Sequence, residues 1–292
     1  MTAERPFVRH GFALALVAVA ALWGATFPLV KESVSRVPPF EFLALRFTLA
    51  SLMMTAAFAP QVRGLGREGL RAGTLSGLAL AAGYSFQTVG LQYTRASNAG
   101  FVTGLFVVFA PVFAAAFLRR PPGVGPAVGV VLATSGLALL SLTTTLHVRK
   151  GDAIVLFAAV SFAAQIVLLA RFAPRHSPAG LTTVQMWVAA LITGVWTLGG
   201  ESHHAPDGYV WMGIAITGIL ASAVAFFVQT AAQRHIGPTR TAVILTSEPA
   251  FAGLFGFLLL DERLTGRGWV GAALILAGML AAELGPKRID AL

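Results

Sequence analysis

Two charged side chains lie inside long apolar stretches of this sequence, and their types could support chemistry. Glu248 stands at the head of the segment EPAFAGLFGFLLL, and Arg46 lies within LRFTLASL. An ionisable group in such surroundings is costly unless it has a partner or a function. The carboxyl group of Glu248 could hold a proton or bind an ammonium group. Both uses remain open, beside a structural role in which it hydrogen-bonds Thr246, Ser247 or a neighbouring helix.

Arg46 is the second deep charge. Counted from Pro38, it lies about 12 Å along its predicted helix, a depth from which its long stem can carry the charge toward the membrane surface. An ion pair with Glu248 would neutralise both groups, although nothing in the sequence indicates a contact. We therefore favour a structural or gating role for Arg46 over direct substrate binding.

The elements that position these charges are predicted to be membrane-spanning helices. Only 11% of the residues are charged and 56% are hydrophobic, against about 25% charged in soluble domains. A spanning helix needs about 20 apolar residues. Such runs lie near residues 11–31, 38–59, 70–93, 96–118, 124–146, 152–171, 179–199, 208–233, 239–260 and 266–284. The sequence therefore predicts an all-α integral membrane protein with ten transmembrane helices, and no separate soluble domain.

The loops predict the orientation of these helices. Lys and Arg are about twice as frequent in the loops on the side of the N-terminus as in the others, which by the positive-inside rule places both termini in the cytoplasm. The net charge of +9 is explained by this basic belt against anionic lipid. The expected location is the plasma (inner) membrane, with the lipid bilayer as partner. Nucleic acid is not expected as a partner, because no basic domain is present.

Three pairs of segments indicate an internal repeat. The pair Gly129 and Gly136 matches Gly271 and Gly278, and Gln87-Thr88 matches Gln229-Thr230 at the same offset along the chain. PVFAAAF (111–117) matches PAFAGLF (249–255) at a slightly smaller offset. Residues 1–148 and 149–292 are therefore predicted to be two five-helix repeats within one membrane domain. An odd number of helices inverts the second repeat, a plan in which transporters place their substrate site near the bilayer midplane.

This pattern resembles the EamA-type transporters of the drug/metabolite transporter (DMT) superfamily over nearly the whole chain. The resemblance rests on the two halves, on a proline-containing helix followed by a Gly-x6-Gly helix in each, and on the segments LRFTLASL and LLLDERLTGRGWVGAALILAGM. Size and aromatic content are similar to the YddG-type aromatic amino acid exporters. The resemblance implies a ten-helix exporter driven by a substrate gradient or by protons. The first half departs from the second at LRRPPGVGPAVG (118–129), which reads about four residues shorter.

Polar-tipped and aromatic residues predict a substrate pathway: Trp23, Tyr84, Gln87, Phe101, Gln165, Trp187, Gln229 and Glu248. A flat apolar pocket with a few amides suits an amphiphilic solute such as an aromatic amino acid, although each aromatic residue also fits a packing or lipid-facing role. Gating or structural roles fall to Pro28, Arg46, Pro111 and Pro249, because a proline inside a helix frees a backbone carbonyl that can line a cavity. The glycines are interpreted as sites of close helix packing.

Enzyme chemistry is not expected. The chain has no cysteine, its histidines fall in predicted loops or ends, and it lacks a phosphate-binding Gly-x4-Gly-Lys-Ser/Thr motif. Glu201, His203, His204 and Asp207 are interpreted as a solvated loop, because their spacing is irregular for a metal site. We expect no metal and no cofactor.

The leading prediction of function is a secondary transporter that exports small metabolites, amino acids including aromatic ones above all, by alternating access about a midplane cavity. A passive channel, a membrane scaffold, and an exporter of drugs or other metabolites remain as alternatives. The oligomeric state is left open, with a monomer compatible with the sequence.

Overall fold

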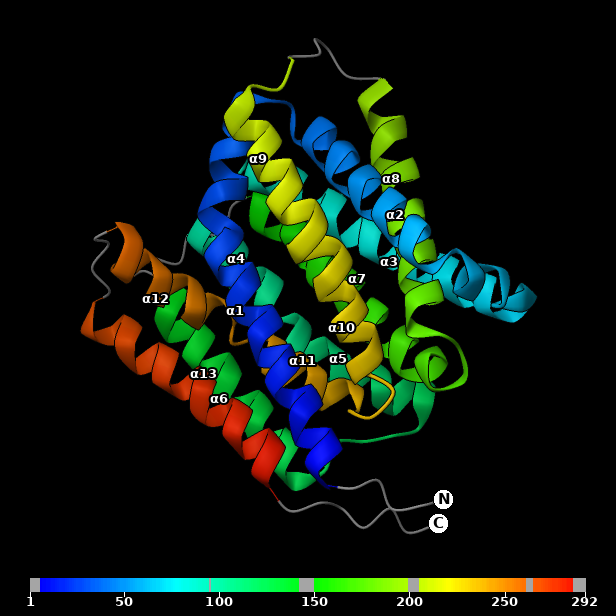
Figure 1. Ribbon diagram of the computed structural model, residues 1–292. Coiled ribbons are helices and arrows are strands. Elements are labelled where there is room, and N and C mark those ends of the chain that lie inside the picture. The colour runs from blue at the N-terminus through cyan, green and yellow to red at the C-terminus, as the bar shows by residue number, and fades with distance from the viewer. Residues whose placement is uncertain (1–5, 95, 142–149, 199–204, 261–264, 286–292) are drawn as a thin grey trace.

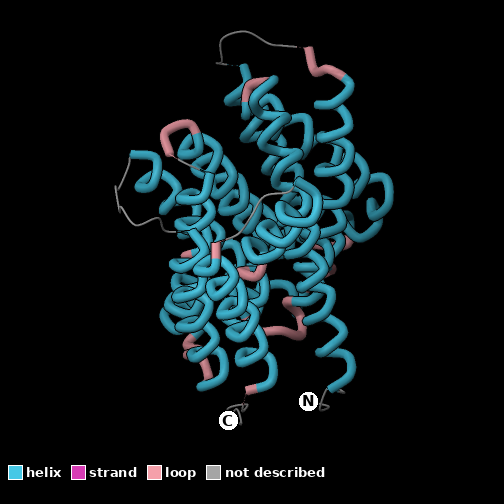
Figure 2. The backbone as a smooth tube through the Cα atoms, turned by 90° about the vertical axis from the view of Figure 1, so that its left-hand side faces the viewer, coloured by secondary structure: helices cyan, strands magenta, loops and turns pink. Residues whose placement is uncertain are grey.

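The computed structural model describes residues 6–94, 96–141, 150–198, 205–260 and 265–285. Within these ranges the chain is a bundle of helices without a strand (Figures 1 and 2). The elements are α1 (Pro6–Arg36), α2 (Pro39–Arg63), α3 (Gly66–Leu91), α4 (Ala96–Gly104), α5 (Phe106–Leu118), α6 (Val124–Ser141), α7 (Lys150–Phe172), η1 (Ala173–Arg175), α8 (Pro178–Leu198), α9 (Gly208–Ile216), the π-helical η2 (Thr217–Val224), α10 (Ala225–Ala232), α11 (Pro238–Leu245), α12 (Glu248–Leu260) and α13 (Gly266–Leu284).

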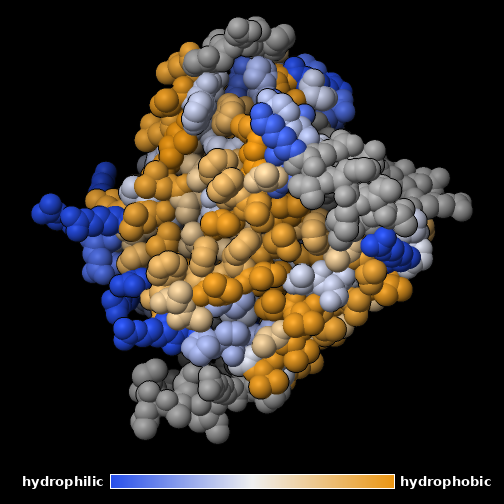
Figure 3. All heavy atoms as spheres, turned by 180° about the vertical axis from the view of Figure 1, so that it is seen from behind, coloured by the Kyte–Doolittle hydropathy of each residue, from blue (hydrophilic) through white to orange (hydrophobic). Residues whose placement is uncertain are grey.

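These helices form ten passes in the described part of the chain, as predicted. Three passes are composite: α4 with α5, α9 with η2 and α10, and α11 with α12. Among the described residues, seven helical segments are long and apolar enough to cross a membrane, two of them composite, and α6 contains a shorter apolar stretch. One face of the molecule shows a broad hydrophobic band with hydrophilic side chains gathered at its edges (Figure 3), the pattern of a surface that faces lipid.

We call the end where α1 begins and α13 ends the basal end, and the end where α1 finishes and α9 starts the distal end (Figure 1).

Two predicted helices are broken in the structure. The run 96–118 divides at Leu105 into α4 and α5, and the run 239–260 divides after Leu245 into α11 and α12. Pro249 was expected inside a helix, which is wrong. It is the second residue of α12, where a missing N–H costs little because that donor has no helical partner. Pro28 and Pro111 do lie inside helices, α1 and α5.

The helix starts fix the register of the two repeats. The starts of α3 and α9, α4 and α11, α5 and α12, and α6 and α13 share one constant spacing, which is also the spacing of Gly129 and Gly271. The starts of α2 and α8 are slightly closer together along the chain. The PVFAAAF and PAFAGLF segments depart from the constant spacing by about one helical turn and are not structurally equivalent. The first half is not shortened at 118–129 either, since the ends of α5 and α12 keep the same spacing as their starts. The boundary predicted at 148 lies outside the described residues.

The paired glycines form the seam between α6 and α13; the sequence predicted close helix packing at such glycines but not that these two helices are partners. A Cβ atom on Gly136 would lie 2.5 Å from the carbonyl oxygen of Gly271, and one on Gly271 would lie 2.7 Å from the carbonyl oxygen of Gly136. Gly129 and Gly278 approach each other in the same reciprocal way. Small residues at these positions allow the two backbones to touch, which drives helix association in lipid. The seam therefore joins the last helix of one repeat to the last helix of the other.

Candidate functional site

A cavity of about 670 Å³ lies between the two repeats. Side chains from α1, α2, α3, α4, α5, α7, α10, α11 and α12 line it: Trp23, Thr26, Val30, Val34, Ser35, Pro39, Leu43, Arg46, Tyr84, Gln87, Thr88, Leu91, Gln92, Thr94, Thr103, Phe106, Phe162, Gln165, Ile166, Phe226, Gln229, Leu245 and Glu248. This volume is within the range of small-molecule sites. The lining is largely apolar, with a few polar groups that can orient a ligand.

Arg46 forms one wall of the cavity and is only 4% exposed. Its Nε donates a hydrogen bond to Ser222 Oγ at 2.7 Å, and one terminal nitrogen donates to the Tyr84 hydroxyl at 3.4 Å. The guanidinium carbon lies 5.2 Å from the centre of the Tyr84 ring and 5.5 Å from that of Phe47. The charge is thus held inside the protein by hydrogen bonds and by two rings, and the side chain does not snorkel to an end of its helix.

The π-helical turn η2 supplies a backbone acceptor next to Arg46. The indole Nε1 of Trp23 donates to the carbonyl oxygen of Ala221 at 2.8 Å, and a terminal nitrogen of Arg46 lies 3.5 Å from the same oxygen. Such wide turns interrupt α-helices at functional sites. Here η2 ties α1 and α2 of the first repeat to the second repeat.

Glu248 faces the cavity from the first residue of α12. The hydroxyls named as its structural partners are engaged elsewhere: Ser247 Oγ donates to Ile244 O at 2.6 Å, and Thr246 Oγ1 donates to Ala242 O at 2.8 Å. Among the described residues Glu248 has neither a hydrogen bond nor an ion pair, and this includes Arg46. Its carboxyl group is therefore available to a ligand or a proton.

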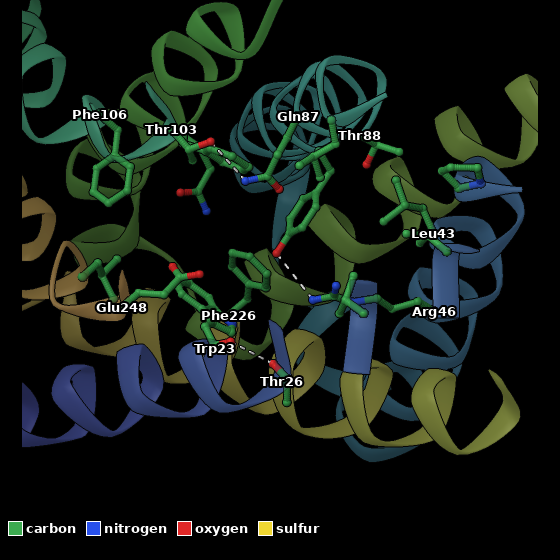
Figure 4. A pocket seen from close by; sticks show the side chains of 18 of the residues that line it. Trp23, Thr26, Leu43, Arg46, Gln87, Thr88, Thr103, Phe106, Phe226 and Glu248 are labelled. Atoms are coloured by element: carbon green, nitrogen blue, oxygen red, sulfur yellow. Dashed lines mark hydrogen bonds between the residues drawn. The ribbon is translucent and has the colours of Figure 1, made fainter. Parts of the chain in front are cut away.

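Figure 4 shows the two charged residues on different walls of the cavity, with Trp23 and Phe226 lying between them. The aromatic rings form a continuous surface, because Trp23 lies 5.2 Å from Phe226 and Tyr84 lies 6.3 Å from Phe226 and 5.4 Å from Phe162 between ring centres. A carboxyl group, a guanidinium group and an aromatic surface thus share one cavity. This arrangement can bind a molecule that carries both charges and an apolar body.

Amide side chains complete the lining. Gln87 Nε2 donates to Thr103 Oγ1 at 3.2 Å across α3 and α4. Gln229 Nε2 donates to Gln165 Oε1 at 3.0 Å, and Gln165 Nε2 donates to Gln185 Oε1 at 3.1 Å. Gln165 and Gln229 are 2% and 1% exposed, and the buried Oε1 atom of Gln229 has no hydrogen-bond partner among the described residues. A buried acceptor without a partner is costly, so this atom is a candidate contact for a ligand.

The structure brings most of the sequence-predicted residues together, but not all of them. The cavity wall contains these residues of the prediction: Trp23, Tyr84, Gln87, Gln165, Gln229, Glu248 and Arg46. Phe101 packs against the apolar core, and Trp187 donates its indole N–H to Thr55 at 2.9 Å; neither lines the cavity. Pro28, Pro111 and Pro249 lie outside the lining as well.

Sequence reasoning missed Phe106, Phe162 and Phe226. The repeat itself carried a signal for two of them, because at the constant spacing of the helix starts Phe226 corresponds to Tyr84, and Phe106 corresponds to Glu248. Equivalent positions of both repeats therefore meet at the cavity with different side chains.

At the distal end, a cluster of charged side chains joins α1 to the start of α9. One terminal nitrogen of Arg36 bonds Asp207 Oδ2 at 2.9 Å, and the other bonds Glu32 Oε1 at 2.8 Å. Asp207 also caps α9 by accepting from the Val210 N–H at 2.8 Å. These bonds, that from Val210 first and that from Arg36 next, hold the pKa of the Asp207 carboxyl below its usual range. Of the suspected loop metal site, Glu201, His203 and His204 lie outside the described residues.

Ten apolar passes in two inverted halves around a central cavity define the class of a multi-pass membrane transporter. The EamA-like transporter family matches residues 11–142 and again residues 149–282. The chain belongs to this family.

Individual relatives agree with this class. An uncharacterized transporter of Archaeoglobus fulgidus is 33% identical over 272 residues, which are 93% of this chain and 85% of the relative. The uncharacterized transporter YyaM of Bacillus subtilis is 26% identical, with 92% of each chain covered. One solved crystal structure superposes with a TM-score of 0.80 at 20% identity and covers 96% of this chain and 99% of its own. At that identity the similarity shows the fold alone.

Proposed function

We propose that the protein exports amino acids, aromatic ones included, by alternating access of the cavity to the two sides of the inner membrane. One observation carries this proposal: the cavity holds the carboxyl of Glu248 and the guanidinium of Arg46 on different walls, with aromatic rings between them. An amino acid zwitterion carries the complementary charges. Its ammonium group would meet Glu248, its carboxylate would meet Arg46, and an aromatic side chain would lie on Trp23 and Phe226.

The hydrogen bonds of the two charged groups support this assignment. Arg46 uses its Nε and one terminal nitrogen within the protein, and its other terminal nitrogen has no hydrogen bond among the described residues. Glu248 has neither a hydrogen bond nor an ion pair among those residues. In a site of low polarity each charge gains from an opposite charge on the substrate, because the interaction is weakly screened. A singly charged solute would leave one of the two groups without a partner and a neutral solute would leave both, which is the basis of selectivity.

The basic loops support one orientation of the cavity in the membrane. The excess of Lys and Arg on the side of the termini supports a cytoplasmic basal end. In that orientation the present cavity, whose lining reaches Ser35 at the distal end of α1 and Thr94 just after α3, would face the outside. Return of the emptied site to the cytoplasmic side would then complete an export cycle.

Counterflow in proteoliposomes tests the proposal. Vesicles loaded with unlabelled phenylalanine should take up radiolabelled phenylalanine, and the uptake should saturate. Phenethylamine, which lacks the carboxylate, and 3-phenylpropionate, which lacks the ammonium group, should compete at least about tenfold less well, as expected for the loss of one charge-assisted hydrogen bond of about 1.5–3 kcal/mol.

Glu248→Gln provides the matched variant. It keeps the shape of the side chain and removes the charge, so the preference for phenylalanine over 3-phenylpropionate should fall. Measuring exchange at two internal pH values separates substrate binding by Glu248 from proton transport. Linear flux without saturation would indicate a channel. Absence of exchange with every amino acid would contradict the proposed substrate.

A further inference from the structure

The cavity is asymmetric between the two repeats. In the first repeat its lining runs from the middle of the protein to the distal ends of α1 and α3, where it includes Ser35 and Thr94. In the second repeat it stops at the middle, and no lining residue lies beyond Ile166 in α7 or Gln229 in α10. Toward the basal end, the second repeat is therefore closed by packed side chains, and the cavity does not continue there.

The register of the repeats identifies what fills this closed half. Leu43 corresponds to Thr182, because each is the fifth residue of its helix, α2 or α8. At the spacing of the starts of α3 and α9, Thr88 on α3 corresponds to Thr230 on α10, and Leu91 corresponds to Gln233, directly after α10. The three first-repeat residues line the cavity, whereas none of their three counterparts does. The counterparts are 0%, 0% and 2% exposed, in the same order, and Leu43 is 3% exposed although it borders the cavity.

The closed counterparts are held together by direct hydrogen bonds. Thr182 Oγ1 donates to Thr230 Oγ1 at 3.1 Å and so joins α8 to α10. Gln233 Nε2 donates to the carbonyl oxygen of Ile166 at 2.7 Å and so joins the end of α10 to α7. In the first repeat Leu43 and Thr88 both face the cavity, and a leucine side chain cannot form such a bond. At equivalent positions, the first repeat therefore borders the cavity, whereas the second repeat is closed by hydrogen bonds.

Inverted repeats allow each half to adopt the conformation of the other, and this exchange turns a site that faces one side toward the other side. From this geometry we infer that Thr182, Thr230 and Gln233 form the closed basal gate and line the substrate pathway in the opposite-facing state. The inference rests on the proposed alternating-access function and adds the route by which the basal side is reached.

The chemistry of the gate differs between its two halves. Two of the three distal positions are leucines, whereas all three basal positions carry a hydroxyl or an amide. Polar groups in a membrane interior are costly unless they are paired or functional. When the basal gate opens, the side chains of Thr182, Thr230 and Gln233 would exchange their present hydrogen bonds for bonds to water or to the charged end of the substrate. The basal route is therefore the more polar one.

Single cysteines test the inference, because the chain has none of its own. Thr230→Cys is treated with a membrane-impermeant maleimide in membrane vesicles of either orientation, with and without phenylalanine. The cysteine should react from the basal side only. The opposite-facing state of a two-state protein is often a minor one, so phenylalanine that drives turnover should raise the rate by about tenfold or more.

Three further variants make the result interpretable. Thr193→Cys is the matched control, because Thr193 is also a buried threonine (0% exposed) that bonds within its own helix, yet its counterpart Met54 does not line the cavity. It should not react. Thr88→Cys should react from the distal side. Gln233→Cys is a second basal reporter that does not depend on how Thr230→Cys folds.

A disulfide gives an independent readout. In the double variant Thr182→Cys/Thr230→Cys the two sulfurs replace hydroxyls 3.1 Å apart, so the thiols meet and oxidation has to close about 1 Å to form the S–S bond. Oxidation should stop phenylalanine exchange and reduction should restore it, while each single variant stays insensitive to oxidation.

The outcomes separate this inference from the proposed function. Labelling of Thr230→Cys and Gln233→Cys from the basal side supports the gate, and it does so even if no amino acid is exchanged. Intact phenylalanine exchange without basal labelling of either variant would overturn the gate and leave the function standing. Labelling of Thr193→Cys at the same rate would show general loosening of the bundle and would also overturn it.

Discussion

The Nε of Arg46 lies 2.7 Å from Ser222 Oγ, and this hydrogen bond orients the guanidinium group across the boundary between the repeats. Arg46 belongs to α2 and Ser222 to η2, so the bond links the first repeat to the second. A lysine at position 46 would keep the charge but has a single nitrogen and cannot reproduce the fork of donors. The orientation of the charge, and not only its presence, is therefore the property that mutation can test.

Arg46→Lys should lower amino acid exchange strongly. Loss of charge-assisted hydrogen bonds of about 1.5–3 kcal/mol each corresponds to roughly ten- to hundredfold in affinity, so the half-saturation constant for phenylalanine should rise by about that factor. Ser222→Ala keeps the arginine and loosens it, and a smaller rise is expected. Counterflow measured over a range of phenylalanine concentrations checks both. Equal activity of Arg46→Lys and the native protein would leave Arg46 with a structural role.

Two tryptophans offer a matched pair. Trp23 and Trp187 each donate one indole hydrogen bond, to Ala221 O at 2.8 Å and to Thr55 Oγ1 at 2.9 Å, but only Trp23 lines the cavity. Each change to phenylalanine removes one neutral bond worth about 0.5–1.5 kcal/mol. Trp23→Phe should therefore weaken phenylalanine exchange by several-fold, whereas Trp187→Phe should leave it unchanged and lower only the thermal stability. The reverse ranking would place the substrate path elsewhere.

The number and order of the passes could be predicted from the sequence, because apolar length alone determines which segments can cross a membrane. Close packing at Gly136 and Gly271 could be predicted as well, since glycine lets two backbones approach closely, whereas their contact with each other is known only from the structure.

The breaks at Leu105 and after Leu245 could not be predicted. Gly104 directly precedes the first break and Pro249 follows the second by two residues, but a glycine or proline near a position does not by itself distinguish a broken membrane helix from a continuous one. The break at Leu105 also explains why the sequence predicts Phe101 and not Phe106 in the substrate pathway. The two residues lie on different sides of the break, and helical periodicity does not predict which residues share a face across it. The orientation of Trp187 away from the cavity is likewise set by tertiary contact with Thr55.

The α6–α13 seam predicts a large effect of a single methyl group. In Gly136→Ala the new Cβ would lie 2.5 Å from Gly271 O and 2.8 Å from the backbone nitrogen of Ile275, and neither backbone atom can move without shifting α13. Overpacking of this kind costs about 1–3 kcal/mol. Gly194→Ala on α8 is the control, because its Cβ would meet nothing within 4 Å. Thermal unfolding in detergent should show a lower midpoint for Gly136→Ala alone.

The distal cluster predicts a dependence of stability on pH. Folding lowers the pKa of Asp207, chiefly through the bond from the Val210 N–H and then through Arg36. A carboxyl whose pKa is lower in the folded protein stabilises it above the unfolded-state value of about 4 and loses this contribution as the pH falls through the lowered value. Asp207→Asn lacks the charge at every pH. Its unfolding midpoint in detergent should thus lie below that of the native protein at pH 7, and the difference should shrink as the pH is lowered below about 4. A difference that stays constant over this range would mean that the Asp207 charge contributes nothing to stability, because asparagine keeps the oxygen that caps α9.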